Sequence, residues 1–414
     1  MDNINSSLSP KKIIAVNMVE GKVIWMSDRI YPQHFYPLSI KDYCYAIKSA
    51  VKKGLKALPI LSISSKDYPY CDFSCEDCLA CPSRNWAIKA GHIKYPVIPL
   101  DKYKNMLKEI SRYSKERGVD RVRFEFCGEG NPDLYEHRAE IIRYAAQECN
   151  MGVVYVSTGS HLTDDLCYTL VKNASFIRIS FPGITTEAYA HYSGQSRFGY
   201  NDALNLLKKL VALRQQMKRE NGLLLGVRTC LRKDNDGHYK DFIKTIGELG
   251  VDCFQGVKVL LYHNKESQYE KISPQTIREL NEIKEEYAQY GLKHFVVPND
   301  LSSIHINRAL RDTNKPLKCW SSKISPALYG SNLICCVLWD RIINSEFHYG
   351  IMEGESGELE SMMHGERAEF IAQHCPSCCE ECCSFADNQF IDELWKVLKL
   401  QDDIDEIDFF FEYC

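Results

Sequence analysis

Three cysteines within eight residues are the feature that most constrains this chain of 414 residues. Cys71, Cys75 and Cys78 lie in the segment CDFSCEDC, a C-x3-C-x2-C spacing. Three thiols so close together predict a loop wrapped around one metal centre. The usual ferredoxin arrangement gives a 4Fe–4S cluster four cysteine ligands. Three ligands would leave one iron open to bind a small molecule.

Zinc is the main alternative for this loop. Structural zinc sites usually pair two C-x2-C hooks across a longer loop, and Cys78 with Cys81 would form one such hook. Cys81 is therefore either a spare thiol beside the three-cysteine cluster or a competing ligand. A disulfide set is the other alternative.

Cysteine content and charge indicate the class of protein and its compartment. The chain has 19 cysteines, 45% apolar residues, 26% charged residues and a net charge of −4. The N-terminal segment lacks the apolar core of a signal peptide, and the longest apolar run, Leu333 to Trp339, is too short to span a membrane. We expect a cytoplasmic protein that binds metal or clusters rather than forming disulfides, with no nucleic-acid or membrane partner.

Short apolar strands alternate with longer amphipathic segments between Leu58 and Pro298. Such alternation predicts βαβ units, a parallel sheet and an α/β fold. The expected strands are Pro59–Ile63, Arg121–Phe126, Val153–Ser157, Phe176–Ser180, Leu223–Thr229 and Phe254–Tyr262. The expected helices lie near 101–116, 134–149, 162–172, 201–219, 238–249 and 273–289. Functional loops should come after the carboxyl ends of the strands.

The flanks of this region differ from it. Residues 1–57 read as a strand–turn–strand, IIAVNMV then GKVIWMS, followed by a helix from Ile40 to Leu58. The acidic and aromatic tail QDDIDEIDFFFEYC is either a docked end or a contact surface. Nine of the 19 cysteines lie in the last part of the chain: Cys319, Cys335, Cys336, Cys375, Cys378, Cys379, Cys382, Cys383 and Cys414.

Two polar motifs come after expected strands, as the cysteine loop does. The first is Cys127-Gly128-Glu129-Gly130-Asn131-Pro132, in which glycines allow a close backbone approach; a simple Gly-Asn-Pro turn is the alternative. The second is Ser157-Thr158-Gly159, which could also cap the helix expected near Leu162. Ser180 closes the next strand, and Arg228 lies on the one after it.

The cysteine loop and these polar motifs resemble the radical S-adenosylmethionine (radical SAM) superfamily. The C-terminal cysteines, beginning with the C-x10-G-x4-C of Cys319, Gly330 and Cys335 and continuing with Cys375 and Cys378, resemble its SPASM or twitch domain. The resemblance implies a partial (β/α)6 barrel in residues 58–300, an N-terminal extension in 1–57 and an auxiliary-cluster domain in 301–414. Departures are Asp77 in place of an aromatic residue, Pro182 in place of a carboxylate, and a compressed final cysteine spacing.

The resemblance also implies site residues. Cys71, Cys75 and Cys78 would hold the catalytic 4Fe–4S cluster, whose open iron binds S-adenosylmethionine. Its amino group would meet the segment Gly128, Glu129, Gly130 and Asn131, where Asn131 occupies the usual glutamate position. Its ribose or carboxylate would meet Ser157, Ser180 and Arg228, although a rim ion pair is the alternative for Arg228. One or two auxiliary clusters would use Cys319, Cys335, Cys375, Cys378, Cys382, Cys383 and Cys414. Zinc bound by Cys375, Cys378, Cys382 and Cys383 is the alternative.

The implied reaction is reductive cleavage of S-adenosylmethionine to a 5′-deoxyadenosyl radical, which abstracts hydrogen from a substrate. An electron donor such as flavodoxin or ferredoxin would be a partner. The expected substrate is a ribosomally made peptide that undergoes epimerisation, cross-linking or oxidation. A sugar, cyclitol or nucleoside is the alternative substrate. A multi-cluster electron-transfer protein or a zinc scaffold is the alternative without catalysis.

Overall fold

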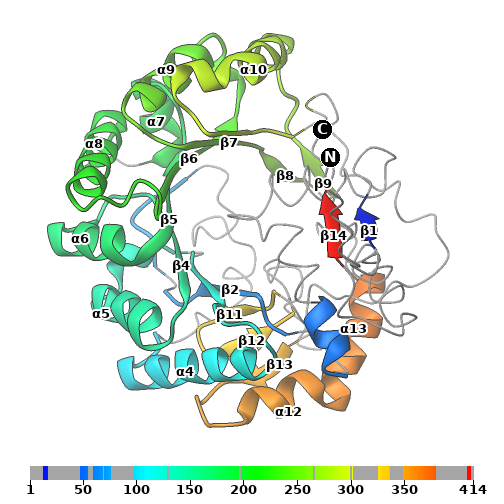
Figure 1. Cartoon of the computed structure of the whole chain (residues 1–414). Coiled ribbons are helices and arrows are strands. Elements are labelled where there is room, and N and C mark those ends of the chain that lie inside the picture. The colour runs from blue at the N-terminus through cyan, green and yellow to red at the C-terminus, as the bar shows by residue number, and fades with distance from the viewer. Residues whose placement is uncertain are drawn as a thin grey trace, which may run out of the picture.

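The computed structural model describes residues 13–16, 47–54, 59–68, 70–75, 97–127, 130–194, 197–263, 266–298, 301, 325–335, 348–378 and 408–411. Their centre is one sheet with the strand order β10-β7-β6-β5-β4-β3-β2-β11-β12-β13. The sheet curves into a partial barrel without closing, as Figure 1 shows. The α/β fold class and the partial barrel are therefore confirmed.

Seven parallel strands form the barrel part of the sheet. They are β2 (Ser62–Lys66), β3 (Arg123–Phe126), β4 (Gly152–Ser157), β5 (Ala174–Phe181), β6 (Leu224–Leu231), β7 (Cys253–Lys258) and β10 (His294–Val296). The first six match the expected strands within a few residues, and β10 was not predicted. The expected strand Phe254–Tyr262 is too long, because β7 ends at Lys258. Beyond that residue, β8 (Leu260–His263) pairs with β9 (Glu266–Tyr269) in a separate antiparallel ribbon.

Helices cover the outer face of the barrel (Figure 1). They are α4 (Leu100–Glu116), α5 (Arg138–Arg143) with the π-helical turn Tyr144–Glu148, α6 (Asp164–Asn173), α7 (Thr186–Ser193), α8 (Tyr200–Gln216), α9 (Tyr239–Glu248) and α10 (Pro274–Glu286). All six expected helices are confirmed in position. The short α7 was not predicted; its hydroxyl N-cap, Thr185, accepts a hydrogen bond from the amide of Ala188.

Strand alternation sends apolar side chains outward and polar side chains inward. In β3, Phe124 and Phe126 are buried in the core beneath the helices, whereas Glu125 belongs to the opposite face. The inner face also carries a small apolar cluster of Cys127, Val154, Val156 and Phe176. The interior of the barrel is therefore mixed, with charged groups placed beside apolar ones.

The C-terminal extension continues the barrel sheet. β11 (Ala327–Tyr329) pairs in parallel with β2, and β12 (Asn332–Ile334) and β13 (His348–Ile351) extend the sheet as antiparallel strands. α12 (Glu358–His364) lies beside α4 at the bottom of the view in Figure 1. α13 (Glu366–Cys378) is the next helix along the chain. A domain boundary near residue 300 stays a prediction.

The two ends of the chain meet in a small parallel ribbon. β1 (Ile13–Val16) pairs with β14 (Asp408–Phe411), so part of the acidic tail is docked. The second strand of the expected hairpin, GKVIWMS, lies outside the described residues. Of the expected helix from Ile40 to Leu58, the described part is helical over residues 47–52.

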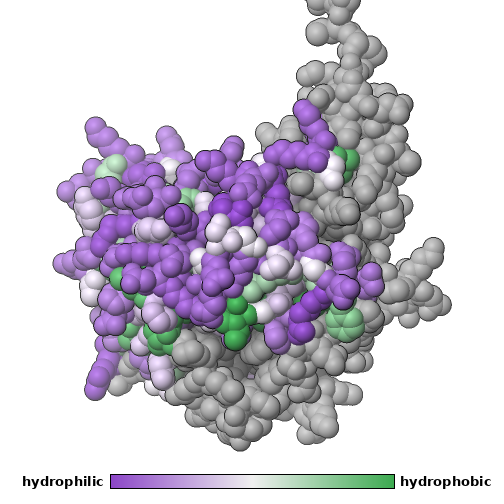
Figure 2. All heavy atoms as spheres, turned by 90° about the horizontal axis from the view of Figure 1, so that it is seen from below, coloured by the Kyte–Doolittle hydropathy of each residue, from purple (hydrophilic) through white to green (hydrophobic). Residues whose placement is uncertain are grey.

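The described surface, seen from below the barrel in Figure 2, is predominantly hydrophilic. Its hydrophobic residues are scattered in small groups rather than joined in one patch. Among the described residues, no helix is both long and apolar enough to cross a membrane.

Candidate active site

The cysteine loop leaves β2 at the carboxyl edge of the parallel strands. Cys71 and Cys75 are half-buried and lie against the core. Cys78 and Cys81 lie outside the described residues, so the third ligand stays a prediction. Two accessible thiols on a fixed loop are chemically suited to ligate a cluster, and the two described cysteines therefore fit the implied group.

A buried ion pair anchors the start of this loop. Asp67 receives two hydrogen bonds from the guanidinium of Arg138, at 2.5 and 3.0 Å, and one from the hydroxyl of Tyr103, at 2.6 Å. Arg138 is 1% exposed and also donates to the carbonyl of Pro132. The pair thus joins the loop after β2 to the start of α5, and the bond to Pro132 extends this link to the loop after β3. Neither residue was singled out in the sequence, because 71 positions separate them.

Gly130 lets the backbones of these two loops touch. A Cβ atom at this position would overlap the carbonyl oxygens of Tyr68 and Tyr70. The amide of the next residue, Asn131, donates to the Tyr70 carbonyl at 2.7 Å. The close backbone approach that Gly130 permits is therefore to the cysteine loop, and an approach of this segment to a ligand stays a prediction. Gly128 and Glu129 lie outside the described residues.

The side chain of Asn131 ties three consecutive loops together. Its Nδ2 lies 3.0 Å from Asp72 Oδ1, 3.2 Å from Thr158 Oγ1 and 2.9 Å from Ser160 Oγ. Its Oδ1 accepts a hydrogen bond from the amide of Asp133. Asn131 is 1% exposed, so these partners already use its hydrogen-bonding groups. Its contact with a cofactor stays a prediction.

Ser157 is held on the outer face of the sheet. Its hydroxyl donates to Asp133 Oδ2 at 2.6 Å and accepts from the amide of Gly159 at 2.7 Å. Burial raises the pKa of Asp133, which also accepts from Tyr155. The helix cap that the sequence offered as its alternative role belongs to Thr163, which caps α6. A contact between Ser157 and a ribose stays a prediction.

Ser180 and Arg228 lie side by side on the inner face, with Gln255 next to them on β7. The register pairs Ser180 with Arg228 and Arg228 with Gln255. Arg178 on β5 donates to Gln255 on β7 at 2.9 Å. Its side chain therefore reaches across β6, where its partner in the register is Gly226. Burial lowers the pKa of Arg228, and burial together with the charge of Arg228 lowers the pKa of Arg178. Arg228 thus belongs to a charged interior, and its cofactor contact stays a prediction.

Glu125 is the acidic member of this interior. Ser64 donates to its Oε2 at 2.5 Å, and Oε1, shielded from solvent, has no hydrogen-bond partner among the described residues. Burial raises the pKa of this carboxyl to about 7, although Ser64 and the charges of Arg178, Arg228 and Lys66 oppose the shift. Glu125 was not predicted from the sequence. Its signal was a charged residue in an alternating strand, Arg123-Phe124-Glu125-Phe126.

The thiol of Cys127 lies beside Glu125. Cys127 is 4% exposed. Burial raises the pKa of its thiol well above the ordinary value, and the charge of Glu125 adds to this shift. It is therefore a protonated thiol at neutral pH. Cys230 and Cys253 lie on the inner face of β6 and β7, and both are half-buried.

The C-terminal cysteines are only partly described. Cys335 comes directly after β12 and is buried. Cys375 and Cys378 belong to the end of α13. Cys319, Cys382, Cys383 and Cys414 lie outside the described residues, and so do Cys336 and Cys379. The auxiliary clusters stay predictions.

Sequence comparison gives no relatives, whereas structural comparison does. No family model matches the chain, and no curated protein matches it. The structure is similar to SuiB of Streptococcus suis bound to S-adenosylmethionine, with a TM-score of 0.56, 12% identity and coverage of 87% of this chain and 81% of SuiB. It is also similar to SuiB bound to the precursor peptide SuiA, with a TM-score of 0.53, 13% identity and the same coverage.

A further solved structure is anSMEcpe with bound AdoMet and the Cp18Cys peptide. Here the TM-score is 0.51 and the identity 13%, over 79% of this chain and 88% of that one. SuiB and anSMEcpe are radical SAM enzymes. At these identities the similarity concerns the architecture. The chain therefore has the fold of the radical SAM enzymes, a partial (β/α) barrel with an added C-terminal segment.

Proposed function

We propose that this protein is a radical SAM enzyme that modifies a peptide. The observation that carries the proposal is the position of the C-x3-C-x2-C loop. It leaves the first barrel strand, β2, at the carboxyl edge of the parallel sheet, in a radical SAM fold. In barrels of this kind the loops at that edge form the active site. An electron-transfer protein or a zinc scaffold would need no such barrel.

Cys71, Cys75 and Cys78 are the proposed ligands of a 4Fe–4S cluster. When bound, that cluster supplies the electron that cleaves S-adenosylmethionine and yields a 5′-deoxyadenosyl radical. The contacts of Asp67, Arg138, Gly130 and Asn131 hold the cysteine loop in place. The protein thereby contributes positioning and exclusion of water, since the cofactors carry the difficult chemistry.

Charged groups on the inner face are placed to receive the rest of the cofactor and the substrate. Ser180 and Arg228 are neighbours across β5 and β6, and a guanidinium is a suitable partner for a carboxylate such as that of S-adenosylmethionine. Glu125, with its pKa of about 7, can take up or release a proton near neutral pH. A reaction that oxidises the substrate would need such an acceptor.

A peptide is the proposed class of substrate. SuiB has been crystallised with its precursor peptide SuiA, and anSMEcpe with a peptide. This chain shares their overall fold over most of its length. An electron donor such as flavodoxin or ferredoxin, and one or two auxiliary clusters bound by the C-terminal cysteines, complete the proposal. Epimerisation, cross-linking and oxidation would all begin with the same radical.

The catalytic part is tested by replacing Cys71, Cys75 and Cys78 together with alanine. After anaerobic reconstitution with iron and sulfide, 5′-deoxyadenosine is measured with dithionite as reductant. We expect the triple variant to form none, while Cys81→Ala keeps most of the activity of the unaltered enzyme. Undiminished formation by the triple variant would refute the ligand assignment.

The substrate class is tested with synthetic peptides encoded beside the gene. They are incubated with the enzyme in deuterated water, and their masses are measured by mass spectrometry. Deuterium gained at one Cα indicates epimerisation, and loss of two hydrogens indicates cross-linking or oxidation. If no peptide changes while an aminosugar or a nucleoside consumes S-adenosylmethionine, the small-molecule alternative is correct.

A further inference from the structure

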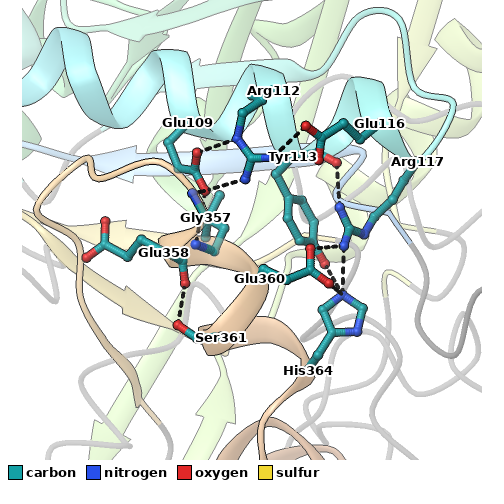
Figure 3. A network of polar contacts seen from close by, with 11 residues as sticks. Glu109, Arg112, Tyr113, Glu116, Arg117, Gly357, Glu358, Glu360, Ser361 and His364 are labelled. Carbon is teal, nitrogen blue, oxygen red and sulfur yellow. Dashed lines mark hydrogen bonds and ion pairs between the residues drawn. The ribbon is translucent and has the colours of Figure 1, made fainter.

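The C-terminal helix α12 is held at both ends by one barrel helix, α4. Figure 3 shows side chains of α4 pointing toward α12 along its length. We call this set of contacts the α4–α12 latch. It is formed by Glu109 and Tyr113 of α4 and its C-cap residue Arg117, with the backbone of Gly357 and Leu359 and the side chains of Glu360 and His364. More than 240 positions separate the two halves of the latch in the sequence.

Glu109 supplies the N-terminal cap that α12 lacks in its own sequence. The N-cap residue is Gly357, which has no side chain to accept a hydrogen bond. Instead, Glu109 Oε1 accepts from the amides of Gly357 and Leu359, both at 3.1 Å. The first amides of a helix have no hydrogen-bond partner within the helix, and that end has a partial positive charge. A carboxylate accepts hydrogen bonds from these amides and is attracted by the positive charge. Glu109 is 3% exposed, so water does not compete for these bonds.

Arg117 holds the other end of α12. Its guanidinium pairs with Glu360 and lies 3.2 Å from His364 Nε2. The hydroxyl of Tyr113 lies 3.0 Å from the same nitrogen, and the Arg117 guanidinium stacks on the Tyr113 ring, with its carbon 3.7 Å from the ring centroid. Arg117 is buried and also donates to the Tyr113 carbonyl. α12 can therefore neither slide nor turn without breaking buried or part-buried polar contacts at one of its ends.

The latch matters because α12 leads directly into a cysteine-bearing helix. A single residue, Gly365, joins α12 to α13, and the end of α13 contains Cys375 and Cys378. α13 itself is buried on one face through Ala368, Ile371 and Ala372. Fixing α12 on α4 therefore fixes the start of the cysteine-bearing helix relative to the barrel.

We propose that Glu109 and Arg117 are positioning residues for the C-terminal cysteines: by latching α12 onto α4, they set where a group ligated by Cys375 and Cys378 lies relative to the barrel. This inference rests on the proposed auxiliary cluster. It assigns to α4 a role separate from the cysteine loop, since the latch contacts named here include none of that loop's residues.

The chain offers a matched control on the same helix. Arg112 binds two carboxylates, Glu109 at 2.8 and 2.9 Å and Glu116 at 2.6 and 2.5 Å. Removing either takes one partner from Arg112, but of the two only Glu109 is bonded to the backbone of α12 in the described part of the chain. Glu109→Ala and Glu116→Ala are therefore compared, with Glu109→Gln as a variant that keeps the size and one oxygen if Glu109→Ala does not fold.

Two readouts separate positioning from general stability. Hydrogen exchange of the full-length protein measures the amides of Gly357 and Leu359. Because a lost cap weakens a helix end, we expect roughly 5- to 30-fold faster exchange in Glu109→Ala and no change in Glu116→Ala. The electron paramagnetic resonance spectrum and the iron content are then measured in the Cys71/Cys75/Cys78 alanine background, where only C-terminal clusters remain.

We expect Glu109→Ala to alter that spectrum or lower that iron content, while the same substitution in the otherwise unaltered enzyme leaves 5′-deoxyadenosine formation within twofold. Equal exchange and equal spectra in the two variants would overturn the inference. Faster exchange with an unchanged spectrum and iron content would also overturn it. If the background variant binds no iron, the proposed auxiliary cluster fails and the inference with it, an outcome distinct from a cluster that ignores Glu109.

Discussion

The two cysteine-bearing regions of this molecule are positioned by different kinds of contact. The loop of Cys71 and Cys75 is tied to the loops of the next two barrel units, through Asp67–Arg138 and Asn131. The C-terminal cysteines depend on partners far away in the sequence: β11 lies on β2, and α12 lies on α4. The first region is held by consecutive units of the barrel, whereas the second is held by elements more than 240 positions away in the sequence.

This difference matters for chemistry. The proposed cluster would need a loop that is rigid where the cofactor binds. The buried contacts of Asn131 and Arg138 give the cysteine loop that rigidity. The C-terminal segment needs only a fixed placement relative to the barrel, which two contacts at the ends of one short helix supply. Breaking each kind of contact separately tests the comparison.

The largest effect is expected from the buried ion pair under the cysteine loop. Arg138→Ala leaves Asp67 buried without its partner, which should lower the free energy of unfolding by about 3–5 kcal/mol. Lys209→Ala removes a pair whose acid, Asp164, is 98% exposed, and should leave the unfolding midpoint almost unchanged. Anaerobic urea unfolding of both variants measures the difference. Similar midpoints would mean that the pair does not anchor the loop.

A methyl group at Gly130 should disturb the loop with less effect on the fold. Gly130→Ala pushes the Cβ atom against the carbonyl oxygens of Tyr68 and Tyr70, so the backbone before Cys71 must move. A displacement of about 1 Å near a reacting centre can cost roughly 100-fold in rate. We expect a loss of that order in 5′-deoxyadenosine formation. In Gly199→Ala, where the nearest atom would lie 3.7 Å from the new Cβ, the rate should be unchanged.

How far the sequence alone could predict the structure depends on the same division between local and distant contacts. Alternating strands and helices reveal the barrel because each element carries its own period, as in the Phe124/Phe126 face of β3. The cysteine spacing and Gly130 are likewise local signals. The pairing of β11 with β2 and the cap that Glu109 gives α12 join residues about 250 positions apart, and no local pattern encodes such a match. Asp67 and Arg138 could not be paired from the sequence for the same reason.

Inside the barrel, the effect of pH should distinguish the interior from the surface. Burial raises the folded-state pKa of Glu125 from its ordinary 4.5 to about 7. Between pH 4.5 and pH 7, Glu125 is therefore protonated in the folded protein but ionised in the unfolded chain. Stability is therefore greatest below pH 4.5 for this group and falls as pH rises toward 7, by at most about 1.4 kcal/mol per unit. Lys66, Arg178 and Arg228 are the basic groups that face Glu125 and oppose this shift.

Glu125→Gln should remove this part of the pH dependence. Urea unfolding at several values between pH 5 and pH 7.5 measures it in both proteins, and Glu140→Gln on the surface serves as control, since that carboxyl has its pKa lowered by Lys104. An unchanged slope in Glu125→Gln would show that Glu125 ionises normally, and the acid–base role proposed for it would then lose its support.

The smallest effect is expected at the exposed edge of the C-terminal segment. Lys102 of α4 lies 2.6 Å from Glu353, whose side chain is 56% exposed, so this contact joins the same two regions as the latch but faces water. Exposed pairs contribute about 0.2–1 kcal/mol, and salt screens them. Glu353→Gln should therefore cost less than about 1 kcal/mol at low salt and nothing measurable at about 1 M salt. It should also leave the exchange of the Gly357 and Leu359 amides unchanged. If it speeds that exchange as much as Glu109→Ala does, the placement of α12 depends on the surface pair as much as on the buried cap. The latch would then have no special role in positioning α12.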